Sequence, residues 1–334
     1  MKDKVFFSNE TKLPPRSERI HEVHLHQDDR NLYDTIKTVC AETAAGLAER
    51  PDKSSLSKGK ENNLMVLINS LRLICDHGEQ LLPKTVKSRI EGTPALSSDS
   101  GMERIRSGSY STRDAQAYNY AAWGSEHQMS MEEGSQITDS HSNLGDGIDN
   151  SAYRPSAKVL AMLSNLEQER KVARYNGRQR KSVVFSYWVK MLDLVEQALR
   201  KENFIFQRID GQTSLEGRRV AIQDFQDDPS CTVMLASVGS SAEGVDLTAA
   251  SVVHLLEPHW SPMVEAQAVD RVYRIGQTQE VTVIRYIVPD SIETHVQSVQ
   301  QEKLRLVNHA INVERATEAE LEAERWKRLK EILT

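Results

Sequence analysis

The stretch Val183-Val184-Phe185-Ser186 is a short apolar run that ends in a serine, which is typical of a buried strand. Apolar side chains then recur every three or four positions, and this spacing predicts a helix that packs along one face. The set comprises Trp188, Met191, Leu192, Val195 and Leu199. A strand followed at once by an amphipathic helix is the repeating unit of α/β proteins, so this stretch decides the fold class.

The same alternation continues toward the C-terminus. Further strands are predicted at 204–209, 232–236, 251–256 and 281–288. Capping patterns predict helix starts at Thr213 with Glu216, at Ser261 with Pro262, and at Asp290 with Glu293. The first of these helices is expected to carry Leu215, Ile222 and Phe225, and Gly276 is expected to end the second.

Strands and helices that alternate in this way indicate a parallel sheet covered by helices on both faces. Such sheets bind ligands beyond the carboxyl ends of their strands. The least ordinary residues of the chain follow the predicted strands, so we expect a site at that edge.

Four segments differ in composition. Residues 1–82 are predicted to be ordered and partly helical, with apolar faces that include Ile36 and Leu71. Residues 83–152 are rich in Ser, Gly, Asp and Asn without periodicity, which predicts a long disordered, flexible insertion. Residues 153–312 form the α/β unit, and 313–334 predict a charged terminal helix.

Composition excludes several classes of protein. The formal net charge is −6, so a basic surface for nucleic acid has to be local. Three scattered cysteines can form neither a disulfide framework nor a four-ligand zinc site. The two nearby histidines His24 and His26 have no third ligand, so no metal site is predicted. No apolar run is long enough for a membrane span, and no signal peptide is evident.

The strongest chemical pattern is the stretch 267–277. On a continuous helix, Gln267, Arg271 and Arg274 would share one face. Two guanidinium groups at a helix C-terminus suit the charge of a transferring phosphoryl group. The alternative interpretation is a plain surface helix with an Asp270–Arg274 ion pair.

Two further patterns follow predicted strands. Residues 237–248 begin at Ser237 and contain small residues, with Gly244 and then Asp246, which suits a ribose contact or the orientation of an arginine. A simple strand-to-loop turn is the alternative. Trp260 precedes a helix and suits stacking on a nucleotide or sugar, but it equally suits a core anchor.

A third pattern is the basic run over 170–181, which includes Arg170, Arg174 and Arg180. Its side chains suit contact with DNA phosphates. A solvated basic face is the alternative.

Taken together, these segments resemble the C-terminal helicase lobe of the Swi/Snf family of ATP-driven DNA translocases. Residues 237–248, 258–262 and 267–277 resemble motifs V and VI in order and spacing, and 184–186 resembles motif IV. The resemblance covers 155–310 and is weaker over 13–82. It is closest to fungal relatives of helicase-like transcription factor.

The resemblance implies a RecA-like fold and specific roles. Arg271 and Arg274 would be arginine fingers, and Gln267, Gly244 and Asp246 would line the nucleotide side. Trp260 and Ser237 would face double-stranded DNA. It also implies chromatin remodelling or DNA repair in the nucleus, with ATP and Mg²⁺ and possible chromatin partners.

The sequence also departs from the family pattern. Ser241-Ala242 stands where the family usually has two glycines, and Ser261 stands where it usually has asparagine. The region 83–152 has no cysteine, so it holds no RING zinc module of the kind that close relatives insert there.

No phosphate loop and no acidic magnesium motif occur in the 334 residues. We therefore expect ATP to be gripped by a first lobe, supplied in cis or in trans, and the chain alone to hydrolyse little or none. Whether the chain is an enzyme stays open. The alternative is a non-enzymatic module, derived from such a motor, that binds DNA or protein.

Overall fold

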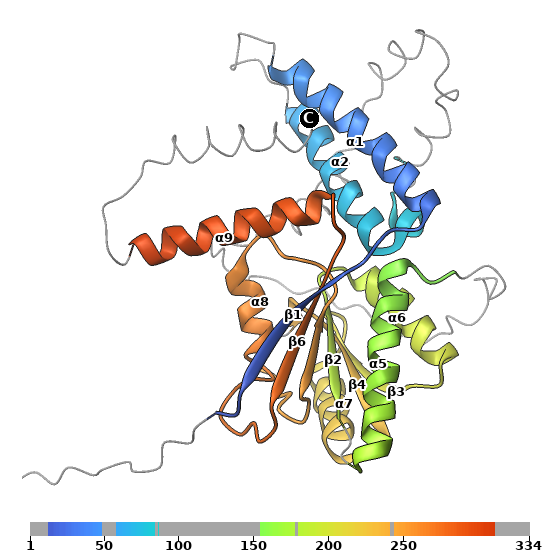
Figure 1. Ribbon diagram of the computed structural model, residues 1–334, viewed down its shortest axis with the longest axis vertical. Coiled ribbons are helices and arrows are strands. Elements are labelled where there is room, and N and C mark those ends of the chain that lie inside the picture. Colours follow the sequence, from blue (N-terminus) through green and yellow to red (C-terminus); the bar gives the residue numbers. More distant parts are fainter. Residues whose placement is uncertain are drawn as a thin grey trace, which may run out of the picture.

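A computed structural model describes residues 13–48, 58–83, 86, 154–177, 180–240 and 244–310. Within these, six strands form one fully parallel sheet in the order β1-β6-β5-β2-β4-β3 (Figure 1). The strands are β1 Arg16–Glu22, β2 Ser182–Ser186, β3 Ile205–Ile209, β4 Cys231–Ser237, β5 Val252–Leu255 and β6 Val281–Ile287. The predicted α/β class, a RecA-like parallel sheet with flanking helices, is confirmed.

Helices cover both faces of this sheet. Helices α5 Ala157–Asn176 and α6 Val189–Lys201 pack on one face, and α7 Leu215–Asp227 and α8 Pro262–Val269 pack on the other. The other described helices are α1 Gln27–Ala48, α2 Lys58–His77 and α9 Ile292–Ala310, with the short 3-10 helix η2 at Gly78–Leu81. Figure 1 shows α1 and α2 side by side beyond one end of the sheet, with α9 crossing near the base of that pair. Ile36 and Leu71 are buried in the core that these three helices share, so their predicted apolar faces are confirmed.

Strand β2 alternates between two cores because successive side chains of a strand point to opposite faces. Val184 packs in the core beneath α5 and α6, together with Met191. Val183 and Phe185 pack in the core beneath α7 and α8. Each fully buried aliphatic side chain of this size contributes about 1.5–3 kcal/mol through removal from water. The central strand is thus the apolar run from which the fold class was predicted.

Strand β1 was not predicted from the sequence. It is an edge strand, and it pairs in parallel with β6 from Arg16 opposite Val281 to Glu22 opposite Ile287. Most of its side chains are exposed and only one of the seven is apolar, so it lacks the apolar pattern by which a strand is recognised. The N-terminal segment therefore joins the same sheet as residues 153–312.

The helix starts differ in detail from the capping predictions. Ser214, not Thr213, caps α7, because its Oγ accepts from the Gly217 backbone N–H at 3.1 Å. Thr213 instead accepts the Asp210 N–H. Helix α7 carries Leu215, Ile222 and Phe225 as predicted, and Leu215 at its start is 81% exposed.

At α9, the Ser291 hydroxyl accepts the backbone N–H of Glu293 at 3.1 Å. Asp290 lies before it in a left-handed conformation, with a φ of 52°. The predicted capping box of Asp290 and Glu293 is therefore wrong, because the Glu293 carboxylate turns inward and accepts the Val288 N–H.

The predicted flexible insertion at 83–152 and the predicted terminal helix at 313–334 lie outside the described residues, apart from Pro83 and Val86. Among the helices that are described, none is long and apolar enough to cross a membrane.

Candidate functional site

Hydrogen bonds join the loop at 244–250 to the turn at 271–277, which belong to the two segments with the strongest chemical patterns. The Leu247 N–H donates to the Arg271 carbonyl at 3.0 Å. The buried Gln277 side chain donates through Nε2 to the carbonyls of Ala250 at 2.8 Å and Thr248 at 3.2 Å. Because these bonds are short and partly buried, they fix the loop at 244–250 against the turn at 271–277. Gln277 is the last residue of the predicted motif at 267–277, and no role for it was predicted from the sequence.

The predicted helical face that would join Gln267 to both arginines is wrong. Helix α8 ends at Val269, and Asp270 is its C-cap. The chain then turns, with the Gln277 N–H donating to the Arg274 carbonyl at 3.0 Å. Val272 is fully buried and packs in the same core as Ala268 and Val269. Gly276, with a φ of 106°, lies at the end of the turn and not of the helix.

The two arginines differ in exposure. Arg274 is exposed, whereas Arg271 is half-buried. Within the described ranges Arg274 makes no ion pair, so the alternative Asp270–Arg274 pair does not form there. Gln267 is also exposed, near the end of α8. The Arg274 guanidinium is therefore open to an anion that arrives from outside this lobe.

The predicted residues lie at two different ends of the sheet. Ser237 ends β4 and Trp260 follows β5, so both belong to the carboxyl edge, as predicted. Arg271 and Arg274 instead lie near the amino ends of β5 and β6, because Gln277 is bound to Ala250 just before β5. The expectation that the site gathers wholly at the carboxyl edge is wrong, since α8 carries the chain back along the sheet.

The loop at 244–250 has a defined conformation. Gly244 is exposed with a φ of 74°, a backbone conformation that glycine adopts without strain. The Asp246 carboxylate accepts from the Thr248 N–H at 3.0 Å and from the Thr248 hydroxyl at 2.8 Å. Asp246 is exposed, but one of its oxygens shapes this turn. Gly244 and the Asp246–Thr248 hydrogen bonds therefore give the loop a fixed conformation beside Arg271.

Ser237 is only 6% exposed. Its hydroxyl accepts from the Ser240 N–H at 3.2 Å. The Ser240 hydroxyl in turn donates to the Ile209 carbonyl at 3.2 Å. The Ser237 side chain thus organises the loop after β4 from within.

Trp260 is half-buried and packs against the helical core of α1, α2 and α9. The Arg72 guanidinium lies 5.8 Å from its ring centroid, and the His295 ring meets it edge-on at 6.2 Å. Lys303 donates to its backbone carbonyl at 3.0 Å. The geometry of Trp260 is that of an anchor, which was the alternative interpretation from the sequence.

A buried cluster of charged side chains, which was not predicted from the sequence, is formed by Lys158, Asp76 and Glu293. Lys158 Nζ is 2.8 Å from Asp76 Oδ1 and 2.6 Å from Glu293 Oε1, and all three side chains are at most 1% exposed. The cluster joins α2, α5 and α9. Burial raises the pKa of Glu293 to about 7, although the Lys158 ammonium opposes this rise. No local spacing could reveal the cluster, because its members are far apart in the sequence.

Glu257 adds a further carboxyl group at the carboxyl edge. Its Oε1 accepts from the Ser186 hydroxyl and from the Tyr187 N–H at 3.0 Å. Burial, reinforced by the nearby Asp76, raises the pKa of Glu257 to about 8. Arg72 donates to the adjacent Pro258 carbonyl at 2.9 Å. These bonds hold the loop that carries Trp260 against β2.

The fold and these segments define a class of protein. Residues 160–276 match the family described as the Helicase conserved C-terminal domain. The structure resembles the C-terminal part of the Fun30 ATPase domain, with a TM-score of 0.58, 19% identity and coverage of 96% of this chain and 97% of that one. It also resembles the Sulfolobus solfataricus SWI2/SNF2 ATPase core in complex with dsDNA, with a TM-score of 0.54, 20% identity and coverage of 88% and 45%.

Curated relatives narrow the class. The chain is 40% identical over 170 residues to DNA repair protein RAD5B of Arabidopsis thaliana, which covers 51% of this chain and 13% of that protein. It is 44% identical over 168 residues to a putative SWI/SNF-related regulator of chromatin of Arabidopsis thaliana, subfamily A member 3-like 1, which covers 49% and 18%. It is 36% identical over 179 residues to DNA repair protein RAD5 of Gibberella zeae, which covers 54% and 15%.

The chain thus carries a helicase conserved C-terminal domain, and it is similar to Swi/Snf-type proteins over that lobe. Both plant and fungal proteins are among its relatives, so the resemblance is not confined to fungi. The matched segment spans less than a fifth of the length of each of these relatives.

Proposed function

We propose that this chain is the second lobe of an ATP-dependent double-stranded-DNA translocase that acts in DNA repair or chromatin remodelling. Arg274, and Arg271 beside it, would meet the phosphates of a nucleotide held by a first RecA-like lobe. The observation that carries the proposal is the fastening of the turn at 271–277 to the loop at 244–250 through Gln277, which leaves the Arg274 guanidinium exposed.

The proposed role of Arg274 depends on preorganisation of its charge. A guanidinium group that stays charged and is held by a fixed backbone can stabilise charge that develops on a transferring phosphoryl group. Arg274 has no internal acidic partner within the described ranges, so contact with an incoming phosphate breaks no ion pair there. Gln267, Gly244 and Asp246 would border the same nucleotide side, because the loop and α8 converge on Arg271.

For DNA, we propose a contact at the carboxyl edge of the sheet. The Sulfolobus ATPase core with a similar fold is described in complex with dsDNA. In this chain Ser237 and Trp260 would act by placing the loops after β4 and β5, because both are held inward by their neighbours. ATP binding would close the two lobes, and hydrolysis would let them separate. The relatives in DNA repair and chromatin regulation imply a nuclear location.

Reconstitution tests this function. The 334-residue chain is mixed with, or fused to, the first lobe of a Swi/Snf relative, and steady-state ATP hydrolysis with Mg²⁺ is measured with and without double-stranded DNA. We expect little hydrolysis by the chain alone and hydrolysis stimulated by DNA in the pair. If the folded pair hydrolyses no more ATP than the isolated first lobe, a non-enzymatic role replaces this proposal.

A further inference from the structure

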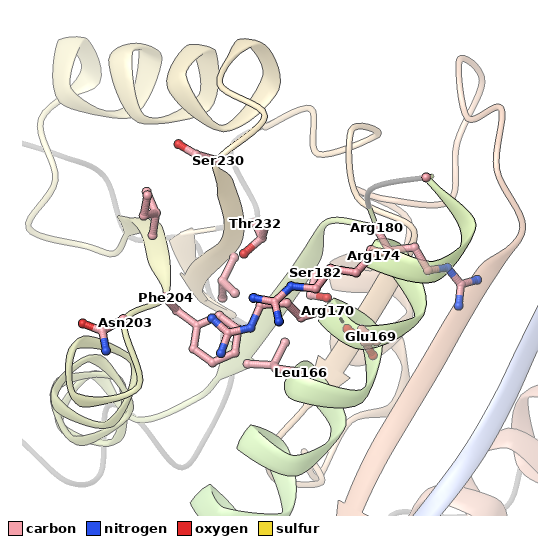
Figure 2. A pocket seen from close by; sticks show the side chains of 14 residues that line it. Leu166, Glu169, Arg170, Arg174, Arg180, Ser182, Asn203, Phe204, Ser230 and Thr232 are labelled. Carbon is pink, nitrogen blue, oxygen red and sulfur yellow. Dashed lines mark hydrogen bonds between the residues drawn. The ribbon is translucent and has the colours of Figure 1, made fainter.

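A cavity of about 450 Å³ lies on the face of the sheet that α5 covers (Figure 2). It is bounded by the C-terminal half of α5 and by the amino ends of β2, β3 and β4. No residue of the 244–250 loop or the 271–277 turn lines it. The cavity is therefore separate from the site proposed for the nucleotide, which lies on the side of α8.

Three arginines of the basic run at 170–181 line this cavity. The Arg170 guanidinium already has partners within the protein. Its Nε donates to Glu167 at 2.7 Å, and the group lies 4.2 Å from the centroid of the Phe204 ring. Figure 2 shows Arg170 and Phe204 together at one wall of the cavity. Arg174 and Arg180, in contrast, form no ion pair within the part of the chain that the structure describes.

One acidic group, Glu169, also lines the cavity, and its charge interacts with that of Arg180. The Glu169 carboxylate accepts from the Ser182 hydroxyl at 2.6 Å, and it lies 3.6 Å from His254 Nε2. Its bonds are thus made within the protein. Arg174, which is exposed, and Arg180, which is half-buried, make no ion pair with a described residue and line the cavity as guanidinium groups for external carboxylates. Guanidinium groups hold carboxylates through paired, charge-assisted hydrogen bonds.

The cavity also has an apolar wall. Ile205 begins the edge strand β3, lines the cavity and is 52% exposed. Leu166 and Phe204 lie deeper and are buried. A nucleic-acid backbone gains little from an exposed isoleucine, whereas a peptide can place an apolar side chain against it while its carboxylates meet the arginines. The combination of charge and apolar surface therefore favours protein over DNA.

We propose that this cavity binds a short acidic segment of a partner protein. One or two carboxylates of that segment are held by Arg174 and Arg180, and a neighbouring leucine-like side chain packs against Ile205. The Arg170–Phe204 stack supplies a rigid wall, which limits the side-chain ordering that binding requires.

The test is a titration of the full chain, labelled with ¹³C at its isoleucine methyl groups and followed by NMR. The probe is the peptide acetyl-Glu-Leu-Asp-Leu-Glu-amide, and its control is the matched amide peptide acetyl-Gln-Leu-Asn-Leu-Gln-amide. The Ile205 methyl signal is assigned with Ile205→Val. We expect a saturable shift of this signal with the acidic peptide and at least about tenfold weaker binding of the amide peptide.

Variants locate the binding. The double variant Arg174→Gln/Arg180→Gln is expected to weaken binding of the acidic peptide by about tenfold or more with an unchanged melting temperature. Arg219→Gln, a matched loss of charge at a side chain on α7 that is 76% exposed, is expected to leave binding unchanged.

Three outcomes overturn the proposal. One is the absence of any Ile205 shift up to about 10 mM acidic peptide. Another is equal binding of the two peptides, which would leave only apolar contact. The third is a short DNA duplex that shifts the same methyl signal at lower concentration than the peptide, which would assign the cavity to nucleic acid.

Discussion

Replacement of Lys158 by methionine tests the buried charge cluster most severely. Lys158 touches Asp76 at 2.8 Å and Glu293 at 2.6 Å with no exposed side-chain surface, and methionine keeps most of its volume. The change leaves two buried carboxyl groups without their cation. Removal of one partner from a buried ion pair costs about 3–5 kcal/mol, so we expect the free energy of unfolding to fall by about that amount. Urea denaturation followed by far-UV circular dichroism measures it.

The control is Lys171→Met, which removes the same charge from an exposed position on the same helix, α5. We expect it to change the free energy of unfolding by less than about 0.5 kcal/mol. If Lys158→Met costs no more than Lys171→Met, the cluster does not hold α2, α5 and α9 together.

Three other changes test separate parts of the structure. Because burial raises the pKa of Glu257 to about 8, the folded state holds a proton that the unfolded state releases at its ordinary pKa. Stability should therefore decrease as pH rises from about 5 to 8, and Glu257→Gln should flatten that dependence in urea titrations at several pH values. Gln277→Ala leaves buried carbonyls unpaired, so we expect the free energy of unfolding to fall by about 1–3 kcal/mol. The control is Gln223→Ala, which changes an exposed glutamine. An equal loss in the two variants would contradict the role of Gln277 in holding the loop at 244–250. Gly244→Ala places a Cβ at a φ of 74°, and we expect it to cost about 1 kcal/mol without loss of fold; a stabilised variant would show that the loop is not held in this conformation.

The fold class was predictable because its signal is local. Val183 and Val184 lie next to each other in the sequence and fill cores on opposite faces, so one apolar run marks the central strand. Strand β1 was not predictable in this way, because its stability comes from pairing with β6 and not from an apolar pattern.

The site was predictable in part. The family resemblance placed Asp246 and Arg271 on the same nucleotide side, and the backbone bond of Leu247 to Arg271 joins their segments. Helical periodicity failed after Val269, because the chain leaves the helix at Asp270 and forms a turn whose bonds, such as that of Gln277 to Ala250, involve a distant segment. The Lys158 cluster escaped prediction because only the folded chain brings its distant members together.

The central claim is that Arg274 acts on a nucleotide bound by another lobe. Its most direct measurement is the kcat for ATP hydrolysis stimulated by DNA in the reconstituted pair of lobes, with Arg274→Ala compared with Arg219→Ala. We predict that Arg274→Ala lowers kcat by about 10³-fold while the variant stays folded and still binds DNA, and that Arg219→Ala changes kcat little. An Arg274→Ala pair with the kcat of the unmodified pair would contradict the claim.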